Sequence, residues 1–580
     1  MTELSSSDTC NIGYYPGEDA RNNIISYLDA HAANMPDHPA LRWVDTRELA
    51  AWDGNLETPL PYHEVSYGSF VQGIKAVAGG LATLGIRKGD RVVIFLPMGV
   101  AMYTAMFAVQ HLGAVAVFLD SWARREHLGV SAACVEPVAM ISHHAAFELI
   151  NTIPEFAHMP TRIIAGPGEY PSYTARLENL FALDSSTPLV PMASDSSALI
   201  TFTTGSSGIP KGANRTHRFL SAQHIALAQI LPYTTNDSDL PAFPIFSLNN
   251  LASGVTTIIP ALDLAKPSPR DGMILIAQIC QQQITCTTLS PSMLRTVSAS
   301  CRENSITLPS LRRVITGGAP ISRDDVSGFR AIAPNARILV LYGSTEVEPM
   351  AHIDDQEMLA QQGPADPEIV EYGVNVGHID ANLAYKFIKI VDGVIDLRHT
   401  SWSELEVPPH AVGEFIVSGE HVCRDYFNNA AAFLRTKIVE SDGRVWHRTG
   451  DLARLDEHNN IWVVGRTSNV INRGETYLFP VQAENILQRV QGVLHGAFLG
   501  LPDDDLKERA AAVVELAVAA NPQVVLQEAQ RLFAKHGIPL DAFYVVTQIP
   551  MDSRHHSKVE YGALRSQLNE TEVKDYLHDC

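Results

Sequence analysis

The chain has 580 residues and carries 43 Lys+Arg against 64 Asp+Glu, which gives a formal net charge of −21. So acidic a surface repels phosphate backbones and anionic lipid headgroups, which excludes a broad nucleic-acid-binding or membrane-surface protein. Hydrophobic residues make up 46% and charged residues 18% of the chain, as in ordinary globular proteins, so large-scale disorder is excluded too. The length predicts more than one domain.

The cysteines and the N-terminal residues indicate a reducing location. The 7 cysteines are scattered along the chain, and no two of them have the C-x-x-C spacing. This pattern favours neither a disulfide framework nor a thiolate metal site. Residues 1–15 lack the basic start and apolar run of a signal peptide, so we expect a cytoplasmic protein.

Residues 92–119 contain no Asp, Glu, Lys or Arg and are long enough to cross a bilayer. Pro97, Gly99 and Gly113 interrupt this stretch. They separate a β-branched run at 91–96, a helix-forming run at 102–111 and an apolar run at 114–119. We therefore predict a buried strand-helix-strand unit and no membrane span.

The same alternation of strands and helices continues along most of the chain. Further strands are expected at 139–142, 162–165, 198–202, 313–316 and 338–342, and helices at 70–84 and 275–283. This order predicts an α/β protein with mixed or parallel sheets flanked by helices.

The pattern changes twice towards the C-terminus. Shorter strand-and-turn units from about residue 370 predict a small β subdomain, with strands at 384–391 and 413–418. After Gly465-Arg466 a small α+β segment follows. We therefore expect an N-terminal domain at 1–465 and a C-terminal domain at 466–580.

The segment 201–217, Thr-Phe-Thr-Thr-Gly-Ser-Ser-Gly-Ile-Pro-Lys-Gly-Ala-Asn-Arg-Thr-His, carries the most chemical information. Glycines let backbone N–H groups approach anionic oxygens, Ser and Thr hydroxyls add donors, and Lys211 adds a charge. The nucleoside-triphosphatase P-loop is excluded, because it requires a glycine at Pro210 and a hydroxyl at Gly212. The composition favours a phosphate-binding loop, although a polar turn without a ligand remains the alternative.

Residues 203–212 closely resemble the phosphate-loop signature of the adenylate-forming superfamily, which comprises acyl-CoA synthetases, peptide-synthetase adenylation domains and luciferases. Other segments resemble further signatures of the superfamily, in its order. They are Gly317-Gly-Ala-Pro320, Tyr342-Gly-Ser-Thr-Glu346, Gly413-Glu414, His447-Arg-Thr-Gly-Asp-Leu452, Gly465-Arg466 and the late Lys558. The resemblance spans residues 25–565 and implies that a carboxylate attacks the α-phosphorus of ATP, with pyrophosphate leaving.

The resemblance assigns a role to each of these positions. Anion repulsion is the obstacle, since unit charges about 4 Å apart interact by about 4 kcal/mol at an effective dielectric near 20. The ATP-binding residues implied are Thr203, Thr204, Gly205, Ser206, Ser207, Gly208 and Lys211 at the phosphates; Thr345 at the α-phosphate; Gly318, Ala319, Pro320, Tyr342, Gly343 and Ser344 around adenine; and Asp451 and Arg466 at the ribose. Glu346 would hold Mg²⁺, a hard cation that prefers carboxylate and phosphate oxygens.

The resemblance also implies a mobile C-terminal domain. Lys558 would enter the site for adenylation, when this domain rotates, and would neutralise the carboxylate and the α-phosphate. A surface lysine in a charged tail is the alternative. Residues of the acyl pocket would include Phe246, Ser247, Asn249, Asn250 and Gly317. Asn249 and Asn250 could place amides near a polar substituent of the acid, or could cap a helix at 251–255.

The second half-reaction is left open by features that disagree. The late motif Asp552-x-Arg-His-x-x-Lys558 departs from the common Pro-Arg-Thr-x-x-Gly-Lys and resembles the β-lactone synthetases of bacterial olefin biosynthesis, which close a β-hydroxy acid to a lactone without coenzyme A. Ser468 stands where the family has a hinge Asp or Lys. Gly474 would leave room for a pantetheine arm and favours a thiol acceptor.

These features together predict an ATP- and Mg²⁺-dependent ligase of the acyl-CoA synthetase type acting on a fatty or other apolar acid. Transfer to coenzyme A or an acyl-carrier protein is the leading second step, and β-lactone closure is the alternative. A non-catalytic nucleotide sensor or scaffold is the alternative of another class, but it would lose the charged residues that this chain retains. We expect no nucleic-acid partner and no transition metal at His143-His144 or His555-His556; a homodimer is the default.

Overall fold

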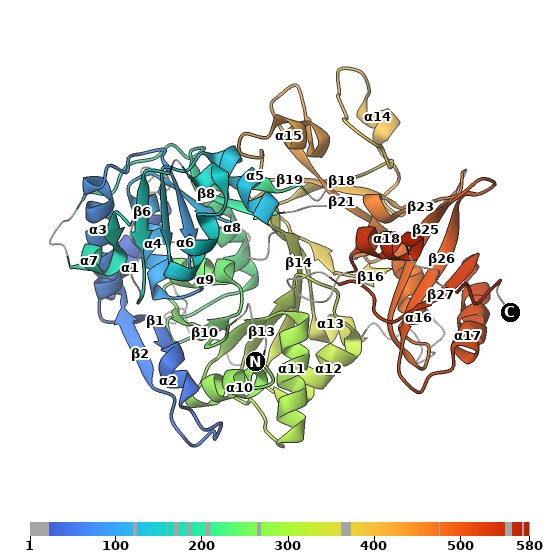
Figure 1. Cartoon of the computed structure of the whole chain (residues 1–580), viewed down its shortest axis with the longest axis horizontal. Helices are drawn as coiled ribbons and strands as arrows, with labels where there is room; N and C mark the ends of the chain where they lie inside the picture. The colour runs from blue at the N-terminus through green and yellow to red at the C-terminus, as the bar shows by residue number, and fades with distance from the viewer. Residues whose placement is uncertain are drawn as a thin grey trace. The chain divides into compact units, whose positions relative to one another are not determined.

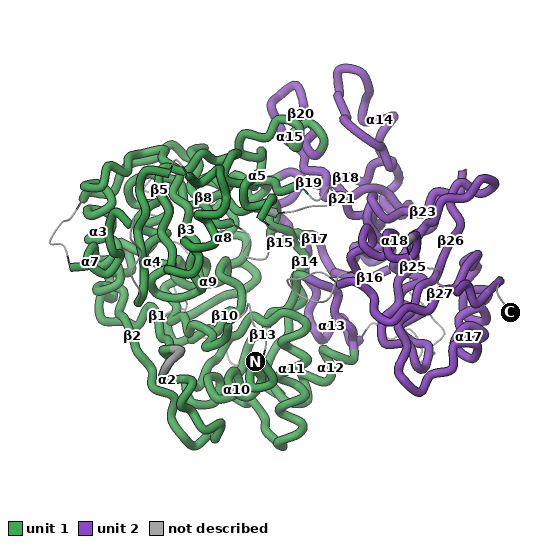
Figure 2. The backbone as a smooth tube through the Cα atoms, viewed as in Figure 1, with its two compact units in different colours: residues 1–318, 324–350, 419–435 green, residues 319–323, 351–418, 436–580 purple. Residues whose placement is uncertain are grey.

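The computed structural model describes residues 23–119, 125–157, 159–167, 173–182, 187–203, 209–263, 268–360, 373–474, 476–551, 559–570 and 574–578. The chain forms two compact units (Figure 2). Unit 1 comprises Met1–Gly318, Asp324–Met350 and Gly419–Arg435, and unit 2 comprises Ala319–Arg323, Ala351–Ser418 and Thr436–Cys580. Each unit is described by itself, and a domain boundary at 465–466 stays a prediction.

The first sheet of unit 1 has the strand order β7-β6-β5-β3-β4-β8-β9. Figure 1 labels β6 and β8 of this sheet. Neighbouring strands are parallel except β9, which is antiparallel to β8. The strands are β3 (Arg91–Phe95), β4 (Val115–Phe118), β5 (Ala139–Ser142), β6 (Thr161–Ile164), β7 (Ala175–Arg176), β8 (Ser197–Thr203) and β9 (Lys211–Thr216). The helices that alternate with them are α3 (Tyr67–Thr83), α4 (Val100–His111), α5 (Arg125–Val135), α6 (His144–Ile150) and α7 (Leu177–Phe181). The predicted α/β class is confirmed.

The uncharged stretch 92–119 forms β3, α4 and β4, as predicted. Val92 and Val93 are fully buried, and α4 is buried from Met102 to His111. The stretch is apolar because its parallel strands and its helix are covered on all sides. Within the described ranges, no helix is long and apolar enough to cross a membrane.

The second sheet has its unit 1 strands in the order β15-β14-β13-β12-β10-β11-β1-β2. From β14 to β1 the pairs are parallel, and β2 is antiparallel to β1 at one edge. The strands are β1 (Pro39–Val44), β2 (Tyr62–Ser66), β10 (Ser238–Pro241), β11 (Thr256–Ile258), β12 (Cys286–Leu289), β13 (Arg313–Gly317), β14 (Arg337–Ser344) and β15 (Val347–Asp354), which runs on into unit 2. The helices along this part of the chain are α1 (Ile25–Asn34), α2 (Thr46–Ala50), α8 (His217–Ile230), α9 (Pro244–Ala252), α10 (Asp271–Gln281), α11 (Pro291–Glu303) and α12 (Arg323–Ile332).

Unit 2 contains the expected β subdomain and the expected α+β segment. The subdomain is an antiparallel sheet of order β16-β22-β21-β19-β18, with β20 paired to β21. Its strands are β16 (Val374–Asn375), β18 (Ala384–Ile388), β19 (Gly413–Ser418), β20 (Lys437–Val439), β21 (Val445–Leu455) and β22 (Ile461–Arg466). The α+β segment holds β25 (Val493–Asp503), β26 (Lys507–Leu516) and β27 (Ala542–Val546), with α16 (Pro480–Leu487), α17 (Pro522–Lys535) and α18 (Tyr561–Glu570). Leu487, Phe498, Phe533 and Phe543 form its core.

Two of the sequence motifs meet in the β subdomain. Arg448 on β21 donates to both carboxylate oxygens of Glu414 on β19, with Nη2 2.6 Å from Oε2, and the two side chains are 9% and 2% exposed. The Arg448 guanidinium also binds the carbonyl oxygens of Val391 and Gly393. Burial raises the pKa of Glu414, although Arg448 opposes this shift. This pair therefore gives one residue of each motif a structural task.

Replacing Arg448 tests whether its pair with Glu414 stabilises the fold. Arg448→Met leaves a buried carboxylate without its partner, so we expect a loss of about 3–5 kcal/mol in the free energy of unfolding. The matched control is Arg398→Met, which removes a pair with Asp396 whose arginine is 85% exposed; because solvent screens such a pair, that change should leave the free energy of unfolding nearly unchanged. Urea unfolding followed by circular dichroism measures both, and equal losses in the two variants would contradict the assigned role.

His217 begins helix α8 directly after the residue that caps it. The Thr216 hydroxyl accepts from the Phe219 N–H at 3.1 Å. His217 is fully buried, and its Nδ1 accepts from the Ile24 N–H at 3.4 Å. Burial, and to a smaller degree the charge of Lys88, lowers the pKa of His217 to about 4.

This lowered pKa predicts a pH dependence of stability. A histidine in the unfolded chain titrates near 6.5, so between about 6.5 and 4 the unfolded chain binds the extra proton. The free energy of unfolding should therefore fall as the pH drops through this window, by up to about 3 kcal/mol from His217 alone. His217→Gln should lessen the slope between pH 7 and 4.5 in urea titrations, and an unchanged slope would refute the assignment.

Candidate active site

The predicted phosphate loop connects two antiparallel strands. Thr203, the last residue of β8, pairs with Lys211, the first residue of β9. The side chain of Thr203 and the whole of Thr204, Gly205, Ser206, Ser207 and Gly208 lie outside the described residues. Lys211 is described, and its Nζ lies 5.9 Å from the ring centroid of Tyr426.

Tyr426 connects Lys211 with the predicted magnesium ligand. Its hydroxyl donates to Oε1 of Glu346 at 2.8 Å, and the residue is 4% exposed. The Cys423 N–H donates to the Glu346 carbonyl oxygen at 2.7 Å. Bridges from Tyr426 to Ala213 and from Val422 to Val347 join the segment 419–435 to β9 and β15. Unit 1 therefore brings together Lys211 and Glu346, which are far apart in the sequence.

The carboxylate of Glu346 fits a magnesium ion bound together with phosphates. The Tyr426 hydroxyl binds one of the two carboxylate oxygens of Glu346. A magnesium ion needs only one or two protein carboxylates, because phosphate and water oxygens complete its coordination. Among the described residues, no group of three His, Cys, Asp or Glu side chains could hold a metal ion by itself.

A second interaction holds the main chain at Thr345, between β14 and β15. Arg215 on β9 donates to the Thr345 carbonyl oxygen from Nε at 3.2 Å and from Nη2 at 2.8 Å. Burial lowers the pKa of Arg215, while the carboxylate of Glu348 is the largest factor that raises it. Burial raises the pKa of Glu348 to about 7, against the effect of Arg215. Arg215 therefore binds the main chain of the predicted α-phosphate contact and interacts electrostatically with Glu348.

The glycine-rich end of β13 lies against β14, where the adenine site is predicted. A Cβ on Gly317 would stand 2.3 Å from the Leu341 carbonyl oxygen, so only glycine fits there. Gly318 has a φ of +81°, which also favours glycine. Tyr342, Gly343 and Ser344 end β14 and are partly exposed. Ala319 and Pro320 belong to unit 2, so their distance from Tyr342 is not described.

Unit 2 brings together the two residues predicted at the ribose. Asp451 on β21 is in register with Arg466 on β22, and Oδ1 of Asp451 lies 2.8 Å from Nε of Arg466. The aspartate side chain is 15% exposed and the arginine 52% exposed, so both reach solvent. Lys558 lies outside the described residues.

Four of the residues predicted near the acyl group lie within 244–252, and all four belong to helix α9. Asn249 and Asn250 are inside this helix, so their interpretation as a cap of a helix at 251–255 is wrong. Phe246 is buried in a core cluster, and Ser247 is fully buried, with its hydroxyl 2.7 Å from that of Tyr103. Asn250 is fully buried beside Asp239, whose pKa burial raises to about 6. Asn249 alone of the four lines the cavity of unit 1 described below.

Similarity to known proteins identifies the family of the chain. The family model described as AMP-binding enzyme matches residues 28–427. The chain belongs to the AMP-binding enzyme family. It is therefore an adenylate-forming ligase, as the sequence motifs predicted.

Two relatives differ in their second reaction. The olefin β-lactone synthetase of Stenotrophomonas maltophilia (strain K279a) is 29% identical over 551 residues, covering 93% of this chain and 96% of that protein. The feruloyl-CoA synthase of an Amycolatopsis species is 29% identical over 451 residues, covering 78% and 83%.

Solved structures confirm the fold. The amide bond synthetase of Marinactinospora thermotolerans has a TM-score of 0.73 at 20% identity, covering 94% of this chain and 100% of that one. The O-succinylbenzoate coenzyme A synthetase of Bacillus subtilis, solved with ATP and magnesium ion, has a TM-score of 0.71 at 20% identity, covering 94% and 99%.

Motif analysis of the sequence missed Tyr426 and Arg215. Arg215 stands within the quoted loop segment, but its task depends on a main-chain carbonyl 130 residues away. Tyr426 lies in Asp425-Tyr-Phe-Asn-Asn429, which carries no chemical pattern of its own. Only the pairing of this segment with β9 and β15 reveals its function.

Removing the Tyr426 hydroxyl should weaken the use of ATP. Tyr426→Phe keeps the ring beside Lys211 but removes the hydrogen bond to the Glu346 carboxylate, so we expect kcat/KM for MgATP to fall by about 10- to 150-fold, as for one lost hydrogen bond to a charged group. Pyrophosphate exchange with varied MgATP measures the change. Tyr385→Phe, at a tyrosine 41% exposed on β18, should have no effect. Equal activity of both variants would contradict the role of Tyr426.

Proposed function

We propose that the protein uses ATP and Mg²⁺ to convert an apolar carboxylic acid with a β-hydroxyl into an acyl-adenylate, and then closes the adenylate to a β-lactone. The first step is supported by the family, by the ordered motifs and by the group of Lys211, Tyr426 and Glu346 in unit 1. The pair of Asp451 and Arg466 in unit 2 supports a ribose contact. A cytoplasmic location and a homodimer stay predictions.

The chemistry of the first step requires positive charge and fixed donors. Lys211 and the loop 203–208 would bind the β- and γ-phosphates and favour the departure of pyrophosphate. Glu346 would hold the magnesium ion, whose charge offsets that of the phosphates when it is bound. The Thr345 hydroxyl would contact the α-phosphate, and Lys558 would lie between this phosphate and the attacking carboxylate. Because like charges repel, these groups supply most of the required stabilisation.

The second step is proposed from the extent of one match. The olefin β-lactone synthetase aligns over 93% of the chain, including the C-terminal region, and the motif 552–558 independently resembles those enzymes. In lactone closure the β-hydroxyl oxygen forms a bond to the acyl carbon, the bond from that carbon to the AMP oxygen breaks, and the hydroxyl proton passes to solvent. The products are the β-lactone and AMP. No thiol takes part.

Thioester formation is the second candidate. A Cβ on Gly474 would meet no atom within 4 Å, and its φ of +84° favours glycine. This open position supports the approach of a pantetheine arm at the loop. The feruloyl-CoA synthase match supports the same outcome but covers less of the chain. A nucleotide sensor is the third candidate, although Lys211, Glu346, Asp451, Arg466 and Lys558 are all retained.

One series of assays separates these candidates. We expect pyrophosphate exchange with long-chain 3-hydroxy acids, and mass spectrometry should show a β-lactone and AMP without coenzyme A. If a coenzyme A thioester is the main product, the second step is thioester formation and not lactone closure. Absence of exchange with every acid class would leave only the sensor.

Lys558→Ala should lower the exchange rate by at least about 100-fold, because the cation at the transferring phosphate is lost. Binding of ATP, measured by calorimetry, should change little. Lys389→Ala, at an exposed lysine of unit 2, is the control. Normal exchange by Lys558→Ala would show that this lysine is not catalytic.

A further inference from the structure

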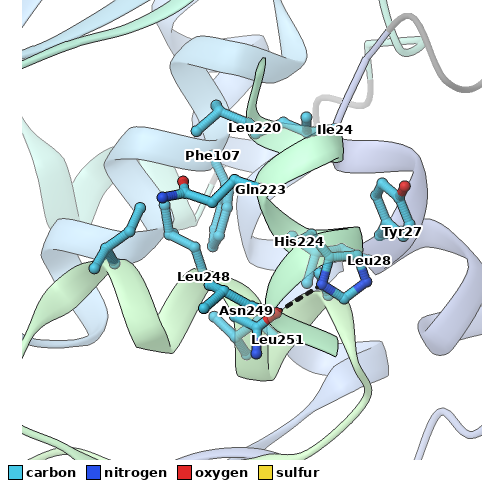
Figure 3. Close-up of a pocket in the computed structure, with 13 residues that line it drawn as sticks. Ile24, Tyr27, Leu28, Phe107, Leu220, Gln223, His224, Leu248, Asn249 and Leu251 are labelled. Carbon is cyan, nitrogen blue, oxygen red and sulfur yellow. Dashed lines mark hydrogen bonds between the residues drawn. The ribbon is translucent and has the colours of Figure 1, made fainter. Parts of the chain in front are cut away.

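Unit 1 contains a cavity of about 40 Å³ between helices α1, α4, α8 and α9 (Figure 3). Its wall is largely apolar, with Leu28, Phe107, Leu220, Leu227, Leu248 and Leu251 among the lining residues. About 10–15 Å³ holds one water molecule, so the space accommodates a short piece of an acyl chain or a few waters.

Polar side chains interrupt this apolar wall, and two of them are paired. Nδ1 of His224 on α8 lies 2.8 Å from Oδ1 of Asn249 on α9 (Figure 3). Since an amide oxygen only accepts, Nδ1 donates, and Nε2 of the neutral ring is an acceptor. Burial lowers the pKa of His224 and favours this neutral form. The Tyr27 ring packs edge-on against the imidazole at 5.1 Å and fixes its orientation.

The amide of Asn249 has an unused donor. Asn249 is 3% exposed, and among the described residues its Nδ2 finds no hydrogen-bond partner. A buried N–H without a partner is destabilising, so such a group in a cavity wall indicates a bound water or a polar ligand atom. His224 and Asn249 together offer one donor and one acceptor, which are what a hydroxyl group requires.

The cavity is close to the segment that carries the predicted magnesium ligand. Gln223, the neighbour of His224 on α8, also lines the cavity, and its Nε2 donates to the Glu348 carbonyl oxygen at 3.1 Å. Glu348 follows Glu346 by two residues. One glutamine side chain therefore spans the distance between the cavity wall and the strand β15, so a substrate group near the carboxyl end of the acid can reach the wall.

We propose that this cavity binds the acid next to its carboxyl end and that the pair His224–Asn249 selects acids with a hydroxyl there. Nδ2 of Asn249 donates to the hydroxyl oxygen, and the hydroxyl hydrogen is donated to Nε2 of His224. Both residues are specificity determinants and do not take part in the chemistry. The proposal rests on the proposed function, because it assigns the residues that recognise the β-hydroxy acid.

The test compares a 3-hydroxy acid with the unsubstituted acid of equal length in pyrophosphate exchange. The wild-type protein should prefer the hydroxy acid by at least about 10-fold in kcat/KM, and Asn249→Leu, which keeps the branched shape of the side chain without its polar atoms, should reduce this preference to less than about 2-fold. His224→Phe keeps the packing against Tyr27 and should act in the same way. Gln229→Ala, at an exposed position of α8, is the control and should keep the preference.

A wild-type protein without this preference, or an unchanged preference in both variants, would overturn the proposal and leave a water site only. The ratio is measured within each variant, so a partial loss of folded protein does not affect it, and the second variant decides if one fails to fold. Failure of the proposed function would give a different experimental result. If the hydroxy acid is preferred but yields no lactone, the recognition stands and the second step is wrong.

Discussion

The hydrogen bond from Tyr426 to Glu346 holds together three parts of the chain that adenylation requires at one place. Lys211 follows the phosphate loop, Glu346 follows β14, and Tyr426 lies in the returning segment 419–435. A carboxylate beside a lysine would by itself form an ion pair that neutralises both. The tyrosine contacts both residues, because its hydroxyl donates to one carboxylate oxygen of Glu346 and its ring faces Nζ of Lys211.

Two buried arginines of this protein act in or beside the sequence motifs. Arg448 and Glu414 fix two strands of the β subdomain, and Arg215 fixes the carbonyl oxygen of Thr345 beside the charge of Glu348. In each pair, burial opposes ionisation of the carboxyl group, so the arginine is needed to keep the charge in place. Several residues that resemble catalytic signatures therefore have structural tasks, and the reacting groups are fewer than the motifs suggest.

The cavity beside α9 applies the same principle, that a buried polar group needs a partner, to the substrate. Apolar side chains can bind a hydrocarbon chain but discriminate weakly between chains with and without a hydroxyl, whereas a polar pair that is left unsatisfied by the wrong acid discriminates strongly. His224 and Asn249 come from two helices, and the packing of these helices sets the distance between them. Selection of the acid would then be separate from its activation, the role proposed for Lys211, Glu346 and Lys558.

Local sequence by itself determined much of this protein. Apolar β-branched runs predicted the buried parallel strands, and the strands at 139–142 and 413–418 have the predicted bounds. The ordered motifs determined the family and the residues that would carry the chemistry.

Only the tertiary structure decided which of these residues meet. Asn249 and Asn250 are adjacent in the chain, yet one lines a cavity and the other is buried beside Asp239, because successive residues of a helix point in different directions. Tyr426 and Arg215 acquire their tasks from atoms 80 and 130 residues away. Contacts over such separations depend on how strands pair and helices pack, and no local pattern of residues records them.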